Sequence, residues 1–256
     1  MVSLTVLASS SAGNSALVAA GGTRILIDAG LSRKETFERL VALGVAPESL
    51  TAILITHEHT DHVAGLPAIA KKLDIPIYIS RLTAPAIAWG DFIPKLELFQ
   101  AGSSFPIGAV EITSFTVPHD AADPVGFSIE AEGIKISIAT DLGYLPDSVR
   151  FQVRDSDVLL LEANHDLDML KVGPYPWSVK QRVMGRMGHL SNDVACKFVR
   201  DELAPRTSTL ILGHLSEHNN HPEIVRLMAA QALDGRSLFT RLVIAEPRQS
   251  TEAFVY

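Results

Sequence analysis

The segment 56-THEHTDHVAG-65 constrains this chain more than any other feature. It places three histidines and two acidic residues in a few positions, directly after the apolar run 52-AILI-55. A continuous apolar run of this kind is typical of a strand buried on both faces of a sheet. Open α/β folds place their ligands at the carboxyl ends of such strands. The sequence therefore predicts a functional site where this strand ends.

The spacing within the segment predicts two metal positions. His57 and His59 are two residues apart, so on an extended segment their side chains project to the same side. Asp61 and His62 fall where the chain turns into a helix, close to a second point. Imidazole and carboxylate ligands without thiolate suit zinc, manganese or iron, and Cys196 is the one cysteine. A polar loop with incidental histidines is the simpler alternative.

A site for two metals needs more ligands, because each metal takes at least three from the protein. The candidates are His119 in VPHD, Asp141 in ATDLG and His214 in ILGHLS, each at the end of a predicted strand. Any one of them alone is equally well explained as a structural residue. Together they complete a site of six or seven ligands, in which Asp141 is the natural bridge, since one carboxylate can offer an oxygen to each metal.

Strand and helix patterns alternate along the whole chain, which predicts two mixed sheets packed together with helices outside. We expect a single domain over residues 1–256. Alternating residues predict a hairpin with one apolar face, made by Phe127, Ile129, Ala131, Ile134, Ile136 and Ile138. Four helices are predicted, over residues 32–44, 61–73, 191–203 and 222–235. The first begins with the capping box Ser32–Glu35, and its predicted apolar set is Phe37, Leu40, Val41 and Leu43.

Composition narrows the function classes. No apolar run approaches the roughly 20 residues of a membrane span, and the N-terminal segment has no basic leader, so we expect a cytoplasmic protein. A net charge of −7 is evidence against a surface-wide nucleic-acid footprint. The best local candidate for binding a substrate phosphate is 180-KQRVMGR-186, with Lys180, Arg182 and Arg186. A solvated helix face explains these charges equally well.

The motifs together resemble a known family. The pattern T-H-x-H-x-D-H, followed by an isolated histidine, a T-D and a later G-H, resembles the metallo-β-lactamase fold superfamily. Within it the chain is similar to the YycJ/WalJ-like branch, bacterial proteins regarded as metal-dependent DNA exonucleases. The motifs that carry this narrower resemblance occur in order: 9-SSSAGNS-15, 27-IDAGLS-32, 117-VPHD-120, 140-TDLG-143, 161-LEANHD-166, 188-GHLSN-192 and 213-GHLSEHNN-220. The resemblance implies a four-layer αβ/βα sandwich.

The resemblance also implies how the ligands are shared between the metals. One metal would be held by His57, His59 and His119. The other would be held by Asp61, His62 and His214, with Asp141 bridging. The chain departs from the family pattern at His218, where an acidic residue is expected; we interpret His218 and His221 as surface residues.

Two cations in such a site lower the pKa of a shared water and stabilise a developing oxyanion, and Asp61 would serve as general base. Glu162 and His189 resemble a catalytic pair in the phosphodiesterase branch, where the histidine binds a phosphate oxygen or protonates the leaving alkoxide. A helix-start hydrogen bond is the alternative for His189. The expected function is a DNA exonuclease that uses this activated hydroxide. Hydrolysis of a small lactone, thioester or cyclic phosphodiester, or a non-enzymatic regulatory module, are the alternatives.

Five further residues have open or secondary interpretations. Asp28, which ends a predicted strand, is expected to brace the metal loop. The turn at Asn14 either approaches the site or only shapes the chain. Tyr175 and Trp177 either stack on a base or pack on the core, and the role of His165 stays open.

Overall fold

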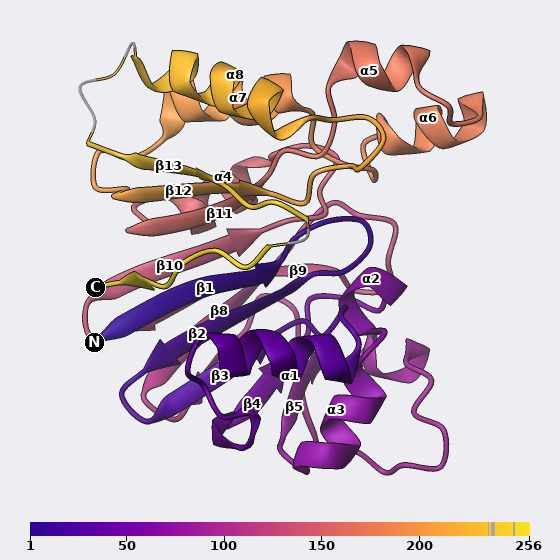
Figure 1. Ribbon diagram of the computed structural model, residues 1–256, viewed down its shortest axis with the longest axis vertical. Helices are drawn as coiled ribbons and strands as arrows, with labels where there is room; N and C mark the ends of the chain where they lie inside the picture. Colours follow the sequence, from indigo (N-terminus) through magenta and orange to yellow (C-terminus); the bar gives the residue numbers. More distant parts are fainter. Residues whose placement is uncertain (235, 237–238, 248) are drawn as a thin grey trace.

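The computed structural model describes residues 1–234, 236, 239–247 and 249–256, and within them two seven-stranded sheets lie face to face (Figure 1). The first sheet has the order β14-β1-β2-β3-β4-β5-β6, and the second has the order β13-β12-β11-β10-β9-β8-β7. The strands of the first sheet are β1 Val2–Ala8, β2 Ser15–Ala20, β3 Thr23–Ile27, β4 Ala52–Leu54, β5 Ile77–Ser80, β6 Leu96–Phe99 and β14 Phe254–Val255. The strands of the second sheet are β7 Ser104–Ile107, β8 Val110–Thr116, β9 Val125–Ala131, β10 Ile134–Ala139, β11 Val158–Glu162, β12 Thr209–Gly213 and β13 Arg241–Ile244.

Helices cover the outer face of each sheet, which produces the predicted four layers (Figure 1). One apolar core lies between the sheets, a second between the first sheet and α1 and α3, and a third between the second sheet and α4, α7 and α8. The helices are α1 Arg33–Ala42, α2 Thr60–Val63, α3 Leu66–Leu73, α4 Asp147–Val153, α5 Leu167–Val172, α6 Trp177–Val183, α7 Asn192–Glu202 and α8 Pro222–Asp234, with short 3₁₀ turns at Pro47–Ser49 and Ala84–Ala86. In the described residues no helix is both long and apolar enough to span a membrane.

Both sheets change from antiparallel to parallel pairing, and this brings the site together. Strands β3 to β6 pair in parallel, as do strands β10 to β13. The carboxyl ends of parallel neighbours meet at one edge of a sheet, so the segments after β4, β10, β11 and β12 converge there. The predicted hairpin β9–β10 is confirmed, with Ile136 opposite Ile129 and both side chains in the core between the sheets.

Most predicted helix boundaries are confirmed. Ser32 caps α1 by accepting from the Glu35 backbone N–H, and Ser191 caps α7 in the same way. Val41 was wrongly placed in the apolar set of α1, since it is 62% exposed and faces away from the core. The end of the last helix was predicted near Gly235, which lies outside the described residues.

The helix predicted over residues 61–73 is wrong as one unit. The chain forms α2 and α3 instead, with Gly65 between them. The backbone of Gly65 packs so tightly against the loop after β3 that a Cβ there would lie 2.0 Å from the Leu31 carbonyl oxygen. This contact holds the start of α3 against the loop after β3. No sequence pattern predicted the edge strands β6 and β7 or the helices α4 to α6.

Candidate metal centre

The segment after β4 supplies the first half of a buried cluster of histidine rings. His57 and His62 are 1% and 0% exposed, and their ring centroids lie 4.1 Å apart. His59 is the N-cap residue of α2, and the short helix places Asp61 in its first turn. The ring centroids of His57 and His59 are 4.6 Å apart. One short segment therefore presents three imidazoles and a carboxylate to the cluster.

The second sheet supplies the other half from three strand ends. His119 follows β8, Asp141 follows β10 and His214 follows β12, and each is at most 2% exposed. Asp141 and His214 have left-handed backbone conformations, with φ of 59° and 56°. Such a conformation costs on the order of 1–3 kcal/mol in a residue other than glycine and is often found at functional sites. Here it turns the chain sharply where the strand ends.

The structure brings all seven predicted ligands together. Ligand atoms lie within 4.8 Å of one another in four sets: His57, His59 and His119; Asp61, His62 and His214; His57, His62 and Asp141; and Asp141, Glu162, His189 and His214. The first two sets match the two groups expected from the sequence. Asp141 belongs to both of the others, with oxygens 3.3 Å from His62 Nε2 and 3.5 Å from His214 Nε2. This central place is what a bridging carboxylate needs.

Four of the imidazoles are held at Nδ1, which leaves Nε2 for a ligand. His57 Nδ1 lies 3.0 Å from Thr56 Oγ1, and His62 Nδ1 lies 2.8 Å from Asp28 Oδ2. His119 Nδ1 lies 3.1 Å from the Gly188 carbonyl, and His214 Nδ1 lies 2.7 Å from Glu162 Oε1. Bonds of this kind fix the ring orientation and raise the basicity of a metal-ligating histidine.

The donor set fits divalent cations. Among the described residues, His57 Nε2 and Asp141 Oδ2 are buried without a hydrogen-bond partner, and such atoms normally have one. Burial lowers the pKa of His57 well below its usual value, which favours the neutral form that binds metal. Burial opposes the charge on Asp141, but the nearby His214 and His62 outweigh it and lower the pKa of that carboxyl. Nitrogen and oxygen ligands in this arrangement suit zinc, manganese or iron.

Asp28 acts as the predicted brace. Its carboxylate accepts hydrogen bonds from the Thr56 backbone N–H and hydroxyl, in addition to the contact with His62. The residue is 4% exposed and has a left-handed backbone, with φ of 57°. It lies behind the ring cluster and therefore orients His62 from outside.

The loop after β1 contacts both halves of the cluster. The Asn14 side-chain amide donates to Asp61 Oδ2 at 3.2 Å, and its backbone N–H donates to the Asp61 carbonyl at 2.7 Å. Ser9 Oγ accepts from the backbone N–H of His214 at 2.7 Å. Gly30 allows this approach, because a Cβ there would lie 1.7 Å from the Asp61 carbonyl oxygen. The turn at Asn14 thus reaches the site and positions Asp61.

Glu162 lies behind the pocket and does not line it. The side chain is fully buried, and Oε1 lies 2.8 Å from His189 Nδ1 as well as 2.7 Å from His214 Nδ1. Oε2 accepts from the backbone N–H groups of Leu142 and Leu190, both at 3.0 Å. Burial opposes its charge, but His189 and His214 lower the pKa of Glu162 to about 2. Direct participation of Glu162 in the reaction, as the resemblance implied, does not fit this enclosed position.

His189 lines the pocket above the cluster. The pocket has a volume of about 390 Å³ and is lined by Ser11, Glu58, His59, Thr60, Asp61, Asp141, Arg182, His189 and His214. The His189 side chain is 21% exposed. Burial lowers the pKa of His189, but the Glu162 charge and hydrogen bond outweigh it and raise that pKa above its ordinary value.

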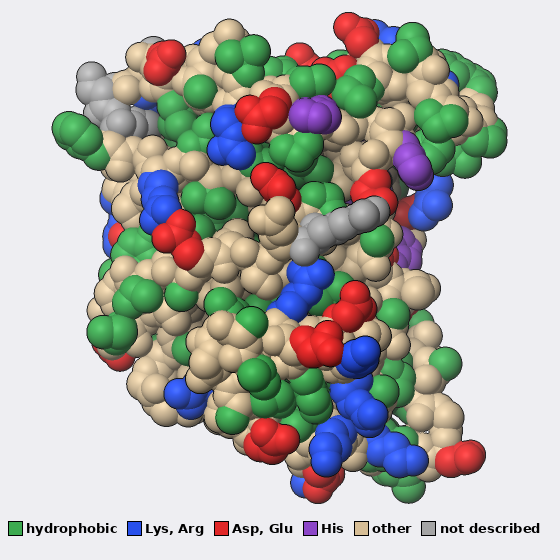
Figure 2. Space-filling view, in the orientation of Figure 1, with side chains coloured by type: hydrophobic (Ala, Val, Ile, Leu, Met, Phe, Trp, Pro, Cys, Tyr) green, Lys and Arg blue, Asp and Glu red, His purple; other side chains and the backbone are tan. Residues whose placement is uncertain are grey.

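The basic segment does not act as a unit. Lys180 is 7% exposed, and its ammonium donates to the Lys171 carbonyl at 2.7 Å, so the prediction that Lys180 contacts substrate does not fit its place. Arg186 packs over the Tyr144 ring, 4.1 Å from its centroid, and is not part of the pocket lining. Arg182 does line the pocket. On the face shown in Figure 2, acidic and basic side chains lie side by side over much of the surface, and a group of basic side chains gathers at the lower right.

The remaining candidates lie outside the pocket lining. His218 and His221 are exposed, as predicted, and Trp177 is 62% exposed. Tyr175 is partly buried, with its ring edge-on to His218. His165 is 1% exposed, and its Nδ1 has no hydrogen-bond partner among the described residues.

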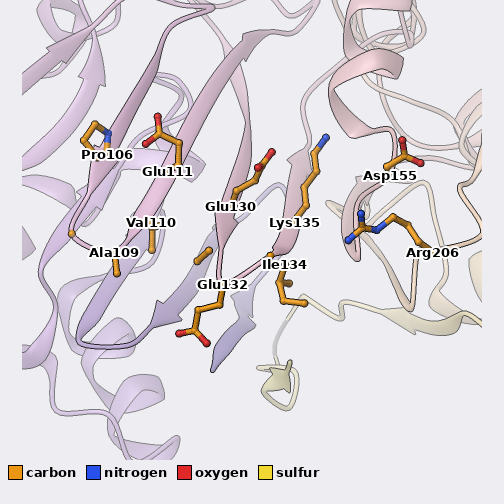
Figure 3. A pocket seen from close by; sticks show the side chains of 13 residues that line it. Pro106, Ala109, Val110, Glu111, Glu130, Glu132, Ile134, Lys135, Asp155 and Arg206 are labelled. Carbon is orange, nitrogen blue, oxygen red and sulfur yellow. The ribbon is translucent and has the colours of Figure 1, made fainter.

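A second hollow, of about 540 Å³, lies at the opposite end of β10 (Figure 3). Glu130 and Lys135 stand beside each other there on paired strands. Arg206 donates from Nε and Nη2 to the Asp157 carboxylate. The residues that line this hollow include no histidine. Of these two hollows, only the pocket above the ring cluster is lined by histidines.

Comparison with known proteins supports the same interpretation. The protein-family model described as the beta-lactamase superfamily domain matches residues 23–214 of this chain. A Bacillus anthracis protein named exodeoxyribonuclease YycJ is 36% identical over 90% of this chain and 88% of its own length. A Streptococcus pneumoniae protein named exodeoxyribonuclease WalJ is 36% identical over 90% of this chain and 87% of its own.

A solved structure shares the fold over nearly the whole length. The metallo-β-lactamase fold protein YhfI from Bacillus subtilis superimposes with a TM-score of 0.74, covering 98% of this chain and 99% of that one, at 18% identity. At this identity the match supports the architecture alone, whereas the sequence matches identify the narrower group. The chain therefore belongs to the metallo-β-lactamase superfamily and, within it, to the family of YycJ and WalJ.

Proposed function

We propose that this chain is a single hydrolase domain that uses two divalent metals, zinc or manganese, to remove nucleotides from DNA ends. The observation that carries the proposal is His189 in the pocket wall, with Nδ1 held by buried Glu162, directly beside the metal-binding sets. A proton donor at this place suits a reaction with a poor alkoxide leaving group. The activity in the names of the two bacterial relatives supports DNA as the substrate. We expect the reaction to take place in the cytoplasm.

Each residue would have a distinct part in the reaction. His57, His59 and His119 would hold one cation, and Asp61, His62 and His214 the other, with Asp141 shared. Bound divalent cations lower the pKa of water and stabilise negative charge on a phosphoryl group.

Asp61 would orient the attacking water and accept its proton, since it lines the pocket and Asn14 fixes its Oδ2. His189 would donate a proton from Nε2 to the leaving oxygen. Glu162 would keep His189 in the required orientation from behind.

A panel of substrates tests the proposal. Purified protein with manganese or zinc would be offered bis(p-nitrophenyl) phosphate, a lactone, a thioester, end-labelled linear DNA and closed circular DNA. We expect cleavage of the phosphodiester and of linear DNA from its ends, while the circle stays intact. Cleavage of the lactone or thioester alone would refute the proposal. Cutting of the circle would show internal cleavage and contradict an action confined to DNA ends.

A further inference from the structure

Arg182 is the one lysine or arginine among the described residues that line the pocket. The acidic side chains of that lining are Glu58, Asp61 and Asp141. Metal ions at the ring cluster would compensate the charge of a phosphate that reaches the cluster. A phosphate held at the mouth of the pocket lies outside that cluster and needs a separate cation. Arg182 has the right charge and place to supply it.

Asp120 fixes the orientation of this guanidinium. Arg182 Nε donates to Asp120 Oδ2 at 2.5 Å. Within the described part of the chain this is the only hydrogen bond of the Arg182 side chain, so Nη1 and Nη2 are free to donate. The side chain is 63% exposed, although the pair joins α6 to the loop after β8. The arginine is thus held through one nitrogen while two others face solvent at the pocket mouth.

The pair lies one step outward from the buried ligands. Asp120 directly follows His119 in the chain, and its Oδ1 lies 3.6 Å from His119 Nε2. His119 is 1% exposed, whereas the Arg182 side chain is mostly exposed. A polynucleotide whose scissile phosphate reaches the buried ligands has to extend its neighbouring phosphate through the pocket, which Arg182 lines. A guanidinium binds phosphate through two parallel N–H···O bonds, which Nη1 and Nη2 can make.

We infer that Arg182, oriented by Asp120, binds the phosphate adjacent to the scissile one, so that the site selects a polynucleotide over an isolated phosphodiester. This inference rests on the proposed phosphodiesterase function and specifies its substrate. Asp120 acts as a positioning residue, since it holds the arginine and does not itself contact the substrate.

Substrates with and without a neighbouring phosphate separate this role from the others. Arg182→Ala should lower kcat/KM for a single-stranded oligonucleotide by about 10–100-fold, the range expected for a lost hydrogen bond to a charged group. The loss in kcat/KM for bis(p-nitrophenyl) phosphate and for the dinucleotide dTpT should be much smaller, because neither has a second phosphate. Asp120→Asn should lower the oligonucleotide value less, since the arginine remains but is no longer paired. Arg226→Ala is the matched control, because it removes the same charge from α8, where Arg226 is partly exposed, paired with Glu223 and not part of the pocket lining.

A binding measurement tests the contact without turnover. Fluorescence anisotropy of a labelled oligonucleotide in EDTA should show weaker binding for Arg182→Ala, and the slope of log K against log salt should be smaller by about 0.7, as for one phosphate contact on a single strand. Equal losses on the oligonucleotide and on bis(p-nitrophenyl) phosphate would overturn the inference, as would unchanged oligonucleotide binding. Wild-type protein that cleaves neither substrate would refute the proposed function, whereas the binding data would still decide the role of Arg182.

Discussion

The first sheet supplies its part of the site from one segment, residues 57–62, whereas the second sheet supplies its part from separate strand ends. On each side a buried carboxylate stands behind a histidine of the proposed ligand set. Asp28 lies 2.8 Å from His62 Nδ1, and Glu162 lies 2.7 Å from His214 Nδ1. The braces differ in one respect, because Glu162 also holds His189. The first brace therefore serves one metal-binding histidine, whereas the second serves a metal-binding histidine and the proposed proton donor.

The largest expected effect comes from removing one ligand in each half. His62→Ala and His214→Ala should both lose metal and reduce activity to background, because each imidazole is fully buried and no neighbouring side chain replaces it. Elemental analysis after metal-replete purification, alongside circular dichroism, measures the loss and checks the fold. Full metal content in either folded variant would remove that histidine from the ligand set.

The second-largest effect is expected from removing the proposed proton donor, which lies on the side of the second sheet. His189→Ala should keep its metal but lose rate by about 10²–10⁴-fold, the range of general acid–base catalysis. The loss should shrink with a nitrophenolate leaving group, which departs without a proton. Steady-state kinetics on DNA and on bis(p-nitrophenyl) phosphate make the comparison. If the variant instead loses metal, His189 is a ligand, which its place in a set with Asp141 and His214 allows.

The third prediction compares the two braces. Asp28→Asn and Glu162→Gln should each weaken metal affinity by about 10–100-fold. The carboxylate oxygens accept hydrogen bonds from N–H and O–H groups, and an amide nitrogen in the same place would face these donors without accepting from them. Glu162→Gln should also lower kcat at saturating metal, since His189 loses its partner, while Asp28→Asn should not. Metal titration by calorimetry and kinetics at saturating metal distinguish these two results. Equal kcat values for the two variants would contradict the proposed difference between the halves.

The smallest effect concerns stability in the metal-free protein. Despite burial, nearby imidazoles lower the pKa of Glu162 from 4.5 to about 2, and carboxylates, Asp141 foremost, raise that of His214 from 6.5 to about 10. The lowered pKa stabilises the fold above about pH 4.5, and this contribution is lost as the pH falls toward 2. The raised pKa stabilises it below about pH 6.5, and this contribution is lost as the pH rises toward 10. The free energy of unfolding should fall by about 1–3 kcal/mol on either side of that window.

Zinc should reverse the alkaline decline, because metal binds the deprotonated imidazole. Thermal melts from pH 2 to 10, in EDTA and with saturating zinc, follow the stability on both sides of the window. The same decline in the presence of saturating zinc would mean that His214 does not bind the metal.

The two halves also differ in how far sequence predicts them. The segment 56–65 was informative because its ligands are neighbours in the chain and directly follow an apolar strand. The scattered ligands were predictable as strand-end residues, and the resemblance to a family grouped them. The prediction that the basic segment 180–186 binds substrate as a unit was wrong, because the spacing of charges does not reveal which side chains are buried. Lys180 is buried against α5, and only Arg182 of the three lines the pocket. The roles of Ser9 and Asn14 were not distinguishable from those of an ordinary turn.

The sequence by itself determined the alternation of strands and helices, the packing faces and the nature of the ligands, because these depend on local periodicity and side-chain chemistry. Tertiary structure alone decided which groups line the pocket. Glu162 is enclosed by two imidazoles and two backbone N–H groups that come from distant segments, so it braces the site and does not line it. Gly65 divides a continuous helical pattern because the loop after β3 packs against its backbone. Such contacts between segments far apart in the chain leave no periodic signal, since each depends on how two sheets meet.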